Sequence, residues 1–196
     1  MRKSFFLLLL ITTGVAPVFS QSTATVKTFT LPDATSGSDF SLDEYAQAKA
    51  VVVIFTGLYC PYAKLYEERI AKLINEYQNN DVRFILVNSN NPRSSEEDSR
   101  ENMADWIKAQ PYKVPYLSDD RQKVASLLGA QKNPEAFVLL RQGDTFKTVY
   151  RGSIDDNPQV AKDAHHFHLR SAIDAVLQNK ANTITPVPAT GCMIKR

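Results

Sequence analysis

Cysteine is scarce in this sequence: only Cys60 and Cys192 occur among its 196 residues. Two cysteines are too few for a structural zinc site of the four-cysteine or three-cysteine type. The three histidines, His165, His166 and His168, fall within four residues and have no cysteine or acidic cluster beside them. We interpret them as part of a solvated helix face, with His165 and His168 on the same side. We therefore expect no metal site and no cofactor.

An excess of charge of one sign is also absent. The chain holds 23 lysines and arginines against 21 aspartates and glutamates, and removal of residues 1–20 would take away Arg2 and Lys3 and leave 21 of each. A neutral chain has no general attraction for nucleic acid or for an anionic membrane. We expect no nucleic acid among its partners.

The apolar segment near the start of the chain, Phe5–Ile11, is too short to cross a bilayer. It follows the basic residues Arg2 and Lys3 and precedes a small residue, Ser20, an arrangement typical of a secretion signal. We predict a signal peptide over residues 1–20, an exported mature protein that is periplasmic or secreted, and no membrane span after cleavage.

The remaining 176 residues are enough for one domain with its own core. Predicted strands and helices fill residues 21–180. Residues 181–196 contain Pro186 and Pro188 and show no periodicity, which favours an extended chain. We predict a single domain over residues 21–180 and an extended C-terminal tail over residues 181–196 that carries Cys192.

Two β-branched runs, Ala50–Phe55 and Val82–Val87, predict strands that are buried on both faces. Between them, Pro61–Tyr77 has helical periodicity and proline at the first helical position. A strand, a helix and a strand within about forty residues form a βαβ unit, whose two strands are parallel.

Shorter elements complete the pattern. They are a strand at Val26–Leu31, helices at Ser41–Lys49, Ser95–Gln110, Gln122–Leu128 and Pro158–Gln178, and a hairpin formed by Ala136–Leu140 and Thr145–Tyr150. A βαβ half followed by a ββα half gives an α/β fold, with a mixed central sheet covered by helices on both faces.

Two finer expectations concern the helix over residues 61–77 and the turn before Pro158. Arg69 is expected in a solvent-facing pair, and Asp155 and Asp156 are expected to cap a turn rather than to bind calcium. The stripe of the helix that should face the core is Leu65, Ile70, Leu73, Ile74 and Tyr77.

Cys60 follows a buried strand and begins a helix. The first N–H groups of a helix lack intrahelical partners and the helix dipole is positive there, so a thiolate is stabilised relative to a thiol. Reactive cysteines in such places have a pKa between about 3.5 and 7.5, compared with about 8.5 for a free cysteine. We predict that Cys60 is a thiolate nucleophile; the alternative is a buried, inert cysteine.

Three dispersed segments of the chain resemble the thioredoxin-like superfamily. They are Phe29–Asp33 with Phe40–Leu42, Val51–Phe55 leading into Tyr59-Cys60-Pro61, and Asn133–Leu139. Within that superfamily the chain is similar to the redoxin branch, which includes peroxiredoxin-like and thiol–disulfide-oxidoreductase-like proteins. It looks like a subgroup with a single Cys-Pro site, the segment Arg151–Asn157 and the tail Gly191–Lys195.

The resemblance implies a thioredoxin-like fold and roles for particular residues. Cys60 takes the nucleophile position, and Pro134 takes the cis-proline position that faces it, which would leave the backbone of Asn133 free to pair with an extended partner strand. By their position beside the thiol, and not from the resemblance, Tyr59, Pro61 and Tyr62 are expected to contact the substrate; the alternative is that the two tyrosines are simply packed at the strand–helix junction.

The sequence departs from the family at two positions. Ala63 stands where a second active-site cysteine would be, three residues after Cys60, so a local dithiol cycle is impossible. Gly57 stands three residues before Cys60, where peroxiredoxins carry a hydroxyl residue, and Thr56 is one residue further away. The usual peroxiredoxin site for hydrogen peroxide is therefore incomplete.

Cys192 is the candidate for the missing thiol. The twelve residue steps from Lys180 span up to about 40 Å, whereas a domain of this size has a radius of gyration of about 16 Å. A bond to Cys60 would close a loop of more than 100 residues and stabilise the fold by up to about 5 kcal/mol. Redox-active pairing, a structural disulfide, and an unpaired or intermolecular Cys192 all remain open.

These observations predict an exported thiol–disulfide oxidoreductase in which Cys60 is the nucleophile and Cys192 the remote resolving thiol. Its expected partners are a disulfide-bearing protein or a small thiol or peroxide substrate, together with an external thiol reductant. The alternatives are a peroxiredoxin-like thiol peroxidase with Cys60 as the peroxidatic residue, and a non-catalytic binding module with a structural disulfide.

Overall fold

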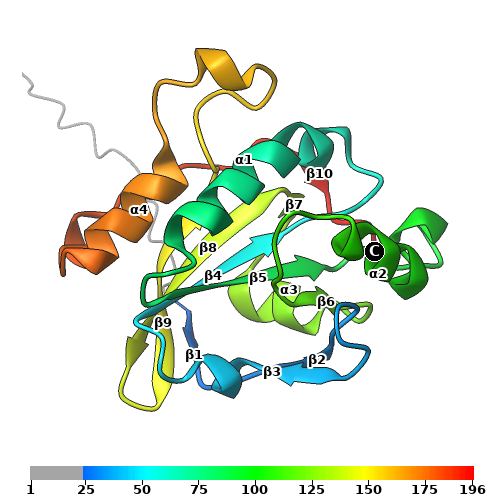
Figure 1. Ribbon diagram of the computed structural model, residues 1–196, viewed down its shortest axis with the longest axis horizontal. Coiled ribbons are helices and arrows are strands. Elements are labelled where there is room, and N and C mark those ends of the chain that lie inside the picture. The colour runs from blue at the N-terminus through cyan, green and yellow to red at the C-terminus, as the bar shows by residue number, and fades with distance from the viewer. Residues whose placement is uncertain (1–23) are drawn as a thin grey trace, which may run out of the picture.

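The computed structural model describes residues 24–196, so the predicted signal peptide lies outside the described residues. Its centre is a six-stranded mixed sheet in the order β1-β9-β8-β4-β5-β6 (Figure 1). The parallel strands are β4 (Ala50–Phe55), β5 (Val82–Asn88) and β6 (Tyr116–Ser118). The antiparallel strands are β8 (Glu135–Gln142), β9 (Thr145–Gly152) and β1 (Thr25–Val26).

Strand β4 lies between β5 and β8, and all six of its residues are buried. Because side chains alternate along a strand, Val52 and Ile54 join one apolar cluster, while Val51 and Val53 join the other. Burial on both faces explains why the sequence of β4 is an unbroken apolar run. The predicted α/β fold with a mixed central sheet is confirmed.

The first apolar cluster lies between the sheet and three helices, α1 (Pro61–Tyr77), α2 (Arg100–Lys108) and α4 (His168–Leu177). The predicted bounds of α1 are confirmed, but its predicted core stripe contains one error. Leu65 is 48% exposed, and Tyr66 is buried in its place. The helical period itself places Tyr66 one turn before Ile70 in the core stripe and Leu65 outside it, and the buried hydroxyl of Tyr66 donates to the carboxylate of Asp155.

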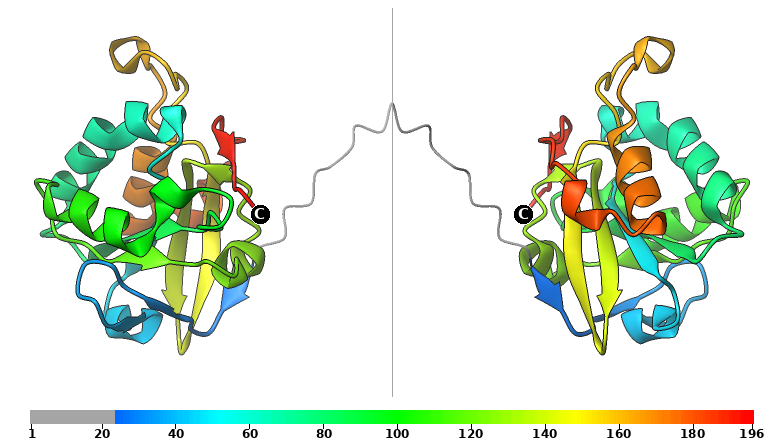
Figure 2. Two further views of the ribbon diagram at one scale, coloured as in Figure 1. Left: turned by 90° about the vertical axis from the view of Figure 1, so that its right-hand side faces the viewer. Right: turned by 90° about the vertical axis from the view of Figure 1, so that its left-hand side faces the viewer.

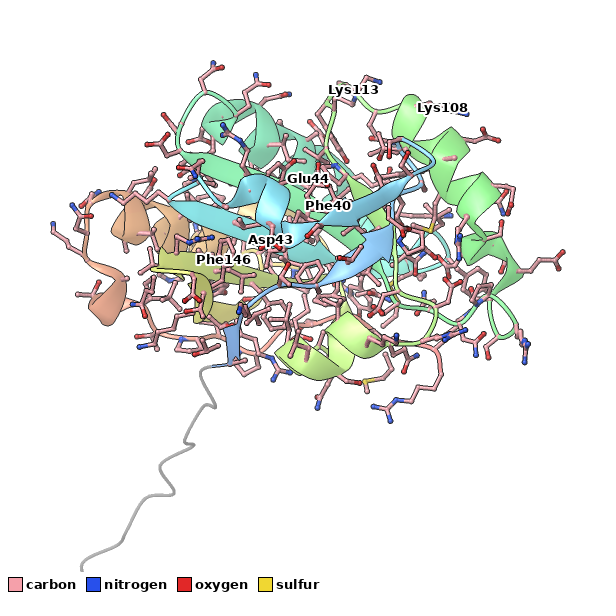
Figure 3. All side chains as sticks on the ribbon, turned by 90° about the horizontal axis from the view of Figure 1, so that it is seen from below. Phe40, Asp43, Glu44, Lys108, Lys113 and Phe146 are labelled. Carbon is pink, nitrogen blue, oxygen red and sulfur yellow. A yellow bond between two sulfur atoms is a disulfide. The ribbon has the colours of Figure 1, made fainter. Side chains whose placement is uncertain are left out.

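The second apolar cluster lies on the opposite face of the sheet. It is covered by α3 (Lys123–Leu128) and by the hairpin of β2 (Thr30–Pro32) and β3 (Asp39–Ser41). Figure 3 views the molecule from this side, with Phe40 labelled on β3. Ser41 and Glu44 form a capping box, but the helix predicted over Ser41–Lys49 is a single 3₁₀ turn over Leu42–Tyr45 and does not reach Lys49.

Two predicted elements are divided in the structure. The strand expected at Val26–Leu31 becomes the end of β1, at the edge of the main sheet, and the start of β2 in a separate hairpin. The helix expected at Ser95–Gln110 becomes a 3₁₀ turn, Glu96–Asp98, followed by α2. It breaks because Ser99 is extended and its side chain caps α2, while Asp98 turns inward to bind buried donors.

The prediction of a helix from Pro158 to Gln178 was wrong over its first half, because α4 begins only at His168. The segment before it projects from the molecule (Figure 2) and contains a 3₁₀ turn at Ala161–Asp163. Side chains there bind backbone N–H groups in place of helical carbonyls. Asn157 accepts from the N–H of Val160, and Asp156 accepts from that of His165.

Arg69 and Asp155 anchor the base of this projecting segment. The prediction that Arg69 forms a solvent-facing pair was wrong: its Nη1 lies 2.7 Å from Asp155 Oδ2, and the two side chains are 11% and 1% exposed. Arg69 also donates to the carbonyl of Asn157. Asp155 accepts the N–H of Asn157, which fits the expected turn. Burial and the hydrogen bond to Asp155 raise the pKa of the Tyr66 hydroxyl, so it stays protonated and donates to that carboxylate.

The C-terminal tail is extended over much of its length, but it is packed against the domain. After a 3₁₀ turn at Ala181–Thr183, the carbonyl of Val187 accepts from the N–H of Ser153. The tail ends in β10 (Cys192–Met193), which pairs antiparallel with β7 (Lys132–Asn133). Within residues 24–196, none of the helices is long and apolar enough to span a membrane.

Replacement of Asp155 by alanine should destabilise the protein by about 3–5 kcal/mol, because it leaves the guanidinium of Arg69 buried without a counter-charge. The matched control is Glu68→Ala, which removes an exposed pair with Lys72 on the same helix and should cost less than about 1 kcal/mol. Urea unfolding of both oxidised variants measures the difference. Equal losses would refute this account of the Arg69–Asp155 pair.

Candidate active site

Cys60 is the N-cap residue of α1, with Pro61 following at the first helical position. Strand β4 ends at Phe55, so the short segment 56–59 carries the chain from the sheet to the helix. The side chain of Cys60 does not cap the helix, and its sulfur is available for other contacts. Because the N–H groups of the first helical turn lie at this point, the site stabilises negative charge on sulfur.

The Asn133–Pro134 segment lies beside Cys60, and its peptide bond is cis, as the family resemblance implied. Its position follows from the sheet: β8 runs antiparallel to β4, and Glu135 pairs with Phe55 at the carboxyl end of β4. The start of β8 therefore reaches the start of α1. The sulfur of Cys60 lies 3.0 Å from the carbonyl oxygen of Asn133.

A disulfide joins Cys60 to Cys192 across 132 residues of sequence. Strand β10 brings Cys192 to this place, because Cys192 is the register partner of Asn133 on β7. Of the alternatives that the sequence left open, an unpaired or intermolecular Cys192 is therefore wrong. Cys60 is 3% exposed, whereas Cys192 is partly exposed. In the disulfide the sulfur of Cys60 carries no proton, so its contact with Asn133 is not a hydrogen bond; it can become one only while reduced Cys60 is a protonated thiol.

A buried carboxylate, Asp98, supports the segment that precedes Cys60. Its Oδ1 accepts from the N–H of Leu58 at 2.6 Å and from Asn88 Nδ2 at 2.8 Å. Its Oδ2 accepts from Asn90 Nδ2 at 2.8 Å and from the hydroxyl of Ser95 at 2.6 Å. Four donors fill the acceptor sites of a carboxylate, so Asp98 ties the loop at Leu58 to the end of β5 and to Ser95.

The same network extends to the cis-proline segment and to the tail. The Oδ1 of Asn90 accepts from Asn133 Nδ2 at 3.2 Å and from the N–H of Lys195 at 2.8 Å. Asn90 therefore links Asp98 to the cis-proline segment and to the tail that carries Cys192. Sequence analysis did not single out Asp98, Asn88 or Asn90. Asp98 falls in the first turn of the helix predicted over Ser95–Gln110, and no local pattern distinguishes it from its neighbours Glu96 and Glu97.

Gly57 lies against this network. A Cβ at position 57 would be only 2.6 Å from Asn90 Nδ2 and 3.3 Å from Asp98 Oδ1. A serine or threonine therefore does not fit here unless the network moves. The missing hydroxyl three residues before Cys60 has a structural cause: the space that it would need is filled by Asn90.

The predicted substrate-contact residues surround Cys60, but they differ in exposure. Tyr59 is 53% exposed, Pro61 is exposed, and Tyr62 is partly buried. Asn133 is fully buried, and its side-chain oxygen has no hydrogen-bond partner. These positions allow Tyr59 and Pro61 to meet another molecule directly, whereas Asn133 offers its backbone.

The described residues contain no group of three or more histidine, cysteine, aspartate or glutamate side chains placed to hold a metal ion. The expectation that His165 and His168 share a helix face was wrong. His165 and His166 belong to the projecting segment, and only His168 belongs to α4. His166 and His168 are stacked instead, with ring centroids 6.1 Å apart.

Comparison with known protein families shows to which family this chain belongs. The model of the AhpC/TSA family matches residues 23–153, which include Cys60 and Pro134. The chain belongs to the AhpC/TSA family. As a member of this family, the protein is a redoxin of thioredoxin-like fold. It is a thiol-dependent redox enzyme, either a thiol–disulfide oxidoreductase or a peroxiredoxin-like enzyme. Cys192 lies beyond the part of the chain that this AhpC/TSA match covers.

Solved structures extend the likeness along the chain. A hypothetical protein from Sinorhizobium meliloti 1021 is 36% identical, with a TM-score of 0.80, and the match covers 90% of this chain and 95% of that one. An uncharacterized conserved protein from Geobacillus kaustophilus is 30% identical, with a TM-score of 0.81, over 89% of this chain and 92% of the other.

More distant structures share the fold alone. A peroxidoxin from Mycobacterium tuberculosis is 18% identical, with a TM-score of 0.52, and the match covers 83% of this chain and 95% of that one. Among curated proteins no significant match was found.

Replacement of Asp98 by alanine should destabilise the oxidised protein by about 3 kcal/mol or more, because three buried donors and one partly buried donor lose their acceptor. Asp105→Ala is the matched control: Asp105 lies on α2 with its side chain 82% exposed, and its loss should change stability by no more than about 0.5 kcal/mol. Urea unfolding followed by tyrosine fluorescence measures both. A loss of less than about 1 kcal/mol for Asp98→Ala would contradict this role.

Proposed function

We propose that this protein is an exported thiol–disulfide oxidoreductase in which Cys60 is the nucleophile and Cys192 the remote resolving thiol. The observation that carries the proposal is the disulfide between the chain's two cysteines at the start of α1. The family match supports thiol chemistry at Cys60, and the tail supplies the second thiol that Ala63 cannot.

In the first step, the Cys60 thiolate attacks one sulfur of a client disulfide. A bond forms between Cys60 and that sulfur, and the other client sulfur leaves as a thiolate. In the second step, the Cys192 thiolate attacks the sulfur of Cys60 and forms the Cys60–Cys192 bond. The remaining client sulfur leaves as a thiolate, so the client has gained two electrons and the enzyme has lost them.

Resetting the enzyme requires an external thiol. Because Cys60 is almost completely buried in the oxidised protein and Cys192 is partly exposed, the incoming thiolate meets Cys192. The sulfur of Cys60 is then the leaving group. Stabilisation of its thiolate by the helix start makes it a good one, since a thiol of lower pKa leaves faster. A second external thiolate then attacks the external sulfur of the mixed disulfide, so Cys192 leaves as a thiolate and both cysteines are reduced, while the two external thiols leave as a disulfide.

Export rests on the sequence of residues 1–20 and on the chemistry of the cysteines. Disulfides persist in oxidising compartments and are rare in the cytosol. A chain whose two cysteines are bonded therefore suits the periplasm or the exterior of the cell, and the external reductant would be a thiol supplied there.

A thiol peroxidase is the second candidate, and the AhpC/TSA match favours it. Cys60 would attack a peroxide oxygen and become a sulfenic acid while water or an alcohol leaves; Cys192 would then form the disulfide and release water. The crowding of Gly57 by Asn90 leaves no room for the hydroxyl that a peroxiredoxin places there. Disulfide exchange is therefore the preferred function.

The reduced Cys192→Ser variant should be alkylated by iodoacetamide at Cys60 with a midpoint well below pH 8.5, because the helix start stabilises the thiolate. The reduced Cys60→Ser variant is the matched control: Cys192 lies on a strand and not at a helix start, so iodoacetamide should alkylate it no faster than free cysteine. If Cys60 reacts at neutral pH no faster than free cysteine, the enzymatic proposal is wrong.

Exposure of the reduced Cys192→Ser variant to a small disulfide should give a stable mixed disulfide at Cys60, since the resolving thiol is missing. Per thiolate, hydrogen peroxide should oxidise the same sulfur no faster than it oxidises free cysteine. Mass spectrometry identifies the mixed disulfide, and dimedone traps any sulfenic acid. Rapid sulfenic acid formation with slow exchange would instead support the peroxidase.

A purely structural disulfide predicts a different result in the wild-type protein. Its reduction potential would lie below about −300 mV, and a small disulfide would not be turned over.

A further inference from the structure

The oxidised tail shows how a cysteine-bearing strand binds beside Cys60. Cys192 and Met193 of β10 pair antiparallel with β7, with Cys192 opposite Asn133 and Met193 opposite Lys132. The ladder continues beyond the strand, since the N–H of Ile194 donates to the carbonyl of Gln131 at 2.9 Å. Backbone pairing of this kind accepts any extended chain, so specificity must come from the side-chain positions.

The position before the cysteine has no room for a side chain. A Cβ on Gly191 would collide with the carbonyl oxygen of Asn133 and would lie 2.7 Å from the carbonyl carbon. This carbonyl cannot withdraw, because Asn133 is fully buried in the active site. A strand bound in this register therefore needs glycine immediately before its cysteine.

The two positions after the cysteine are opposite in character. Met193 is 63% exposed, so the first position makes no demand on its side chain. Ile194 is 9% exposed and belongs to the apolar cluster between the sheet and α3, which includes Val124 and Leu128. The second position therefore selects an aliphatic side chain.

The third position holds a cation. The Nζ of Lys195 lies 3.9 Å from the centroid of the Tyr59 ring and 3.2 Å from the hydroxyl oxygen of Ser95. The N–H of Lys195 donates to Asn90, and its carbonyl accepts from the N–H of Asn91 and from Gln122 Nε2. An ammonium over an exposed aromatic ring favours lysine or arginine here.

We propose that the β7 edge is a docking site for client segments of the pattern glycine, cysteine, any residue, aliphatic residue, basic residue, and that residues 191–195 are the chain's own copy of such a client. The proposal rests on the proposed disulfide exchange at Cys60. The client would occupy the site while its cysteine is bonded to Cys60. The tail and the client then compete for one edge, so formation of the Cys60–Cys192 bond expels the reduced client.

Peptides test this selectivity without altering the fold. The probe is a peptide with the sequence of residues 190–196 whose cysteine carries thionitrobenzoate as a mixed disulfide. The reduced, full mature chain with Cys192→Ser attacks the peptide cysteine, forms a Cys60–peptide disulfide and releases thionitrobenzoate, which absorbs at visible wavelengths. The tail of this variant competes equally with every peptide, so ratios of rates are meaningful.

Replacement of Ile194 by serine in the peptide should slow the reaction at least about tenfold, because an aliphatic side chain loses its buried site. Gly191→Val should slow it at least as much. Met193→Ser is the matched control and should change the rate less than about twofold, since this position is exposed. Lys195→Ser should slow it about two- to fivefold, and this difference should disappear when the protein also carries Tyr59→Ser.

The outcomes separate the two proposals. The control reagent is the small disulfide dithiobis(nitrobenzoate), which also releases thionitrobenzoate when Cys60 attacks it. If Cys60 reacts with this reagent but all peptides react at equal rates, the docking pattern is refuted and the proposed function stands. Failure of Cys60 to react even with that small disulfide would refute the proposed function and the docking pattern with it.

Discussion

The antiparallel pairing of β8 with β4 is the constraint on which the active site depends. It places the start of β8 at the carboxyl end of β4, where the chain turns into α1. Cys60 and the Asn133 backbone therefore meet although 73 residues separate them. Strand β7 lies directly before β8, so the edge on which the tail pairs is held in place by the centre of the sheet.

The tail is as much a part of this site as the helix that carries Cys60. Its contacts are distributed: backbone pairing at Asn133, a hydrogen bond from Lys195 to Asn90, and burial of Ile194 in the core. Each contact holds Cys192 near Cys60 and so raises the effective concentration of one thiol at the other. Because that concentration enters the equilibrium of the disulfide, the noncovalent docking of the tail sets how readily the pair is reduced.

Buried polar groups link the parts of the site that the sheet brings together. Asp98 binds the loop before Cys60, and Asn90 joins Asp98 to Asn133 and to the tail. In a low-dielectric interior such a network is strong when every member is satisfied and costly when one is missing. The crowding of Gly57 by Asn90 follows from this arrangement. The network therefore explains why position 57 is glycine and departs from the peroxiredoxin pattern.

Several elements were determined by the sequence alone, because local or periodic patterns encode them. The β-branched run of β4, the helix from Pro61 to Tyr77 and the hairpin of β8 and β9 have signals within a few residues. The position of Cys60 at the start of a helix is a signal of this kind, and it was sufficient to select the candidate nucleophile. The family resemblance added Pro134, which no local pattern distinguishes.

Only the tertiary structure decided which distant groups meet. The sequence allowed Cys192 to reach Cys60 but could not exclude other states, because reach is a property of chain length whereas pairing depends on the β7 edge. Arg69 and Asp155 looked like surface charges, and Asp98 looked like an ordinary acidic residue in a first helical turn. Burial converted these side chains into structural partners, and burial depends on which elements pack over them, which the local sequence does not specify.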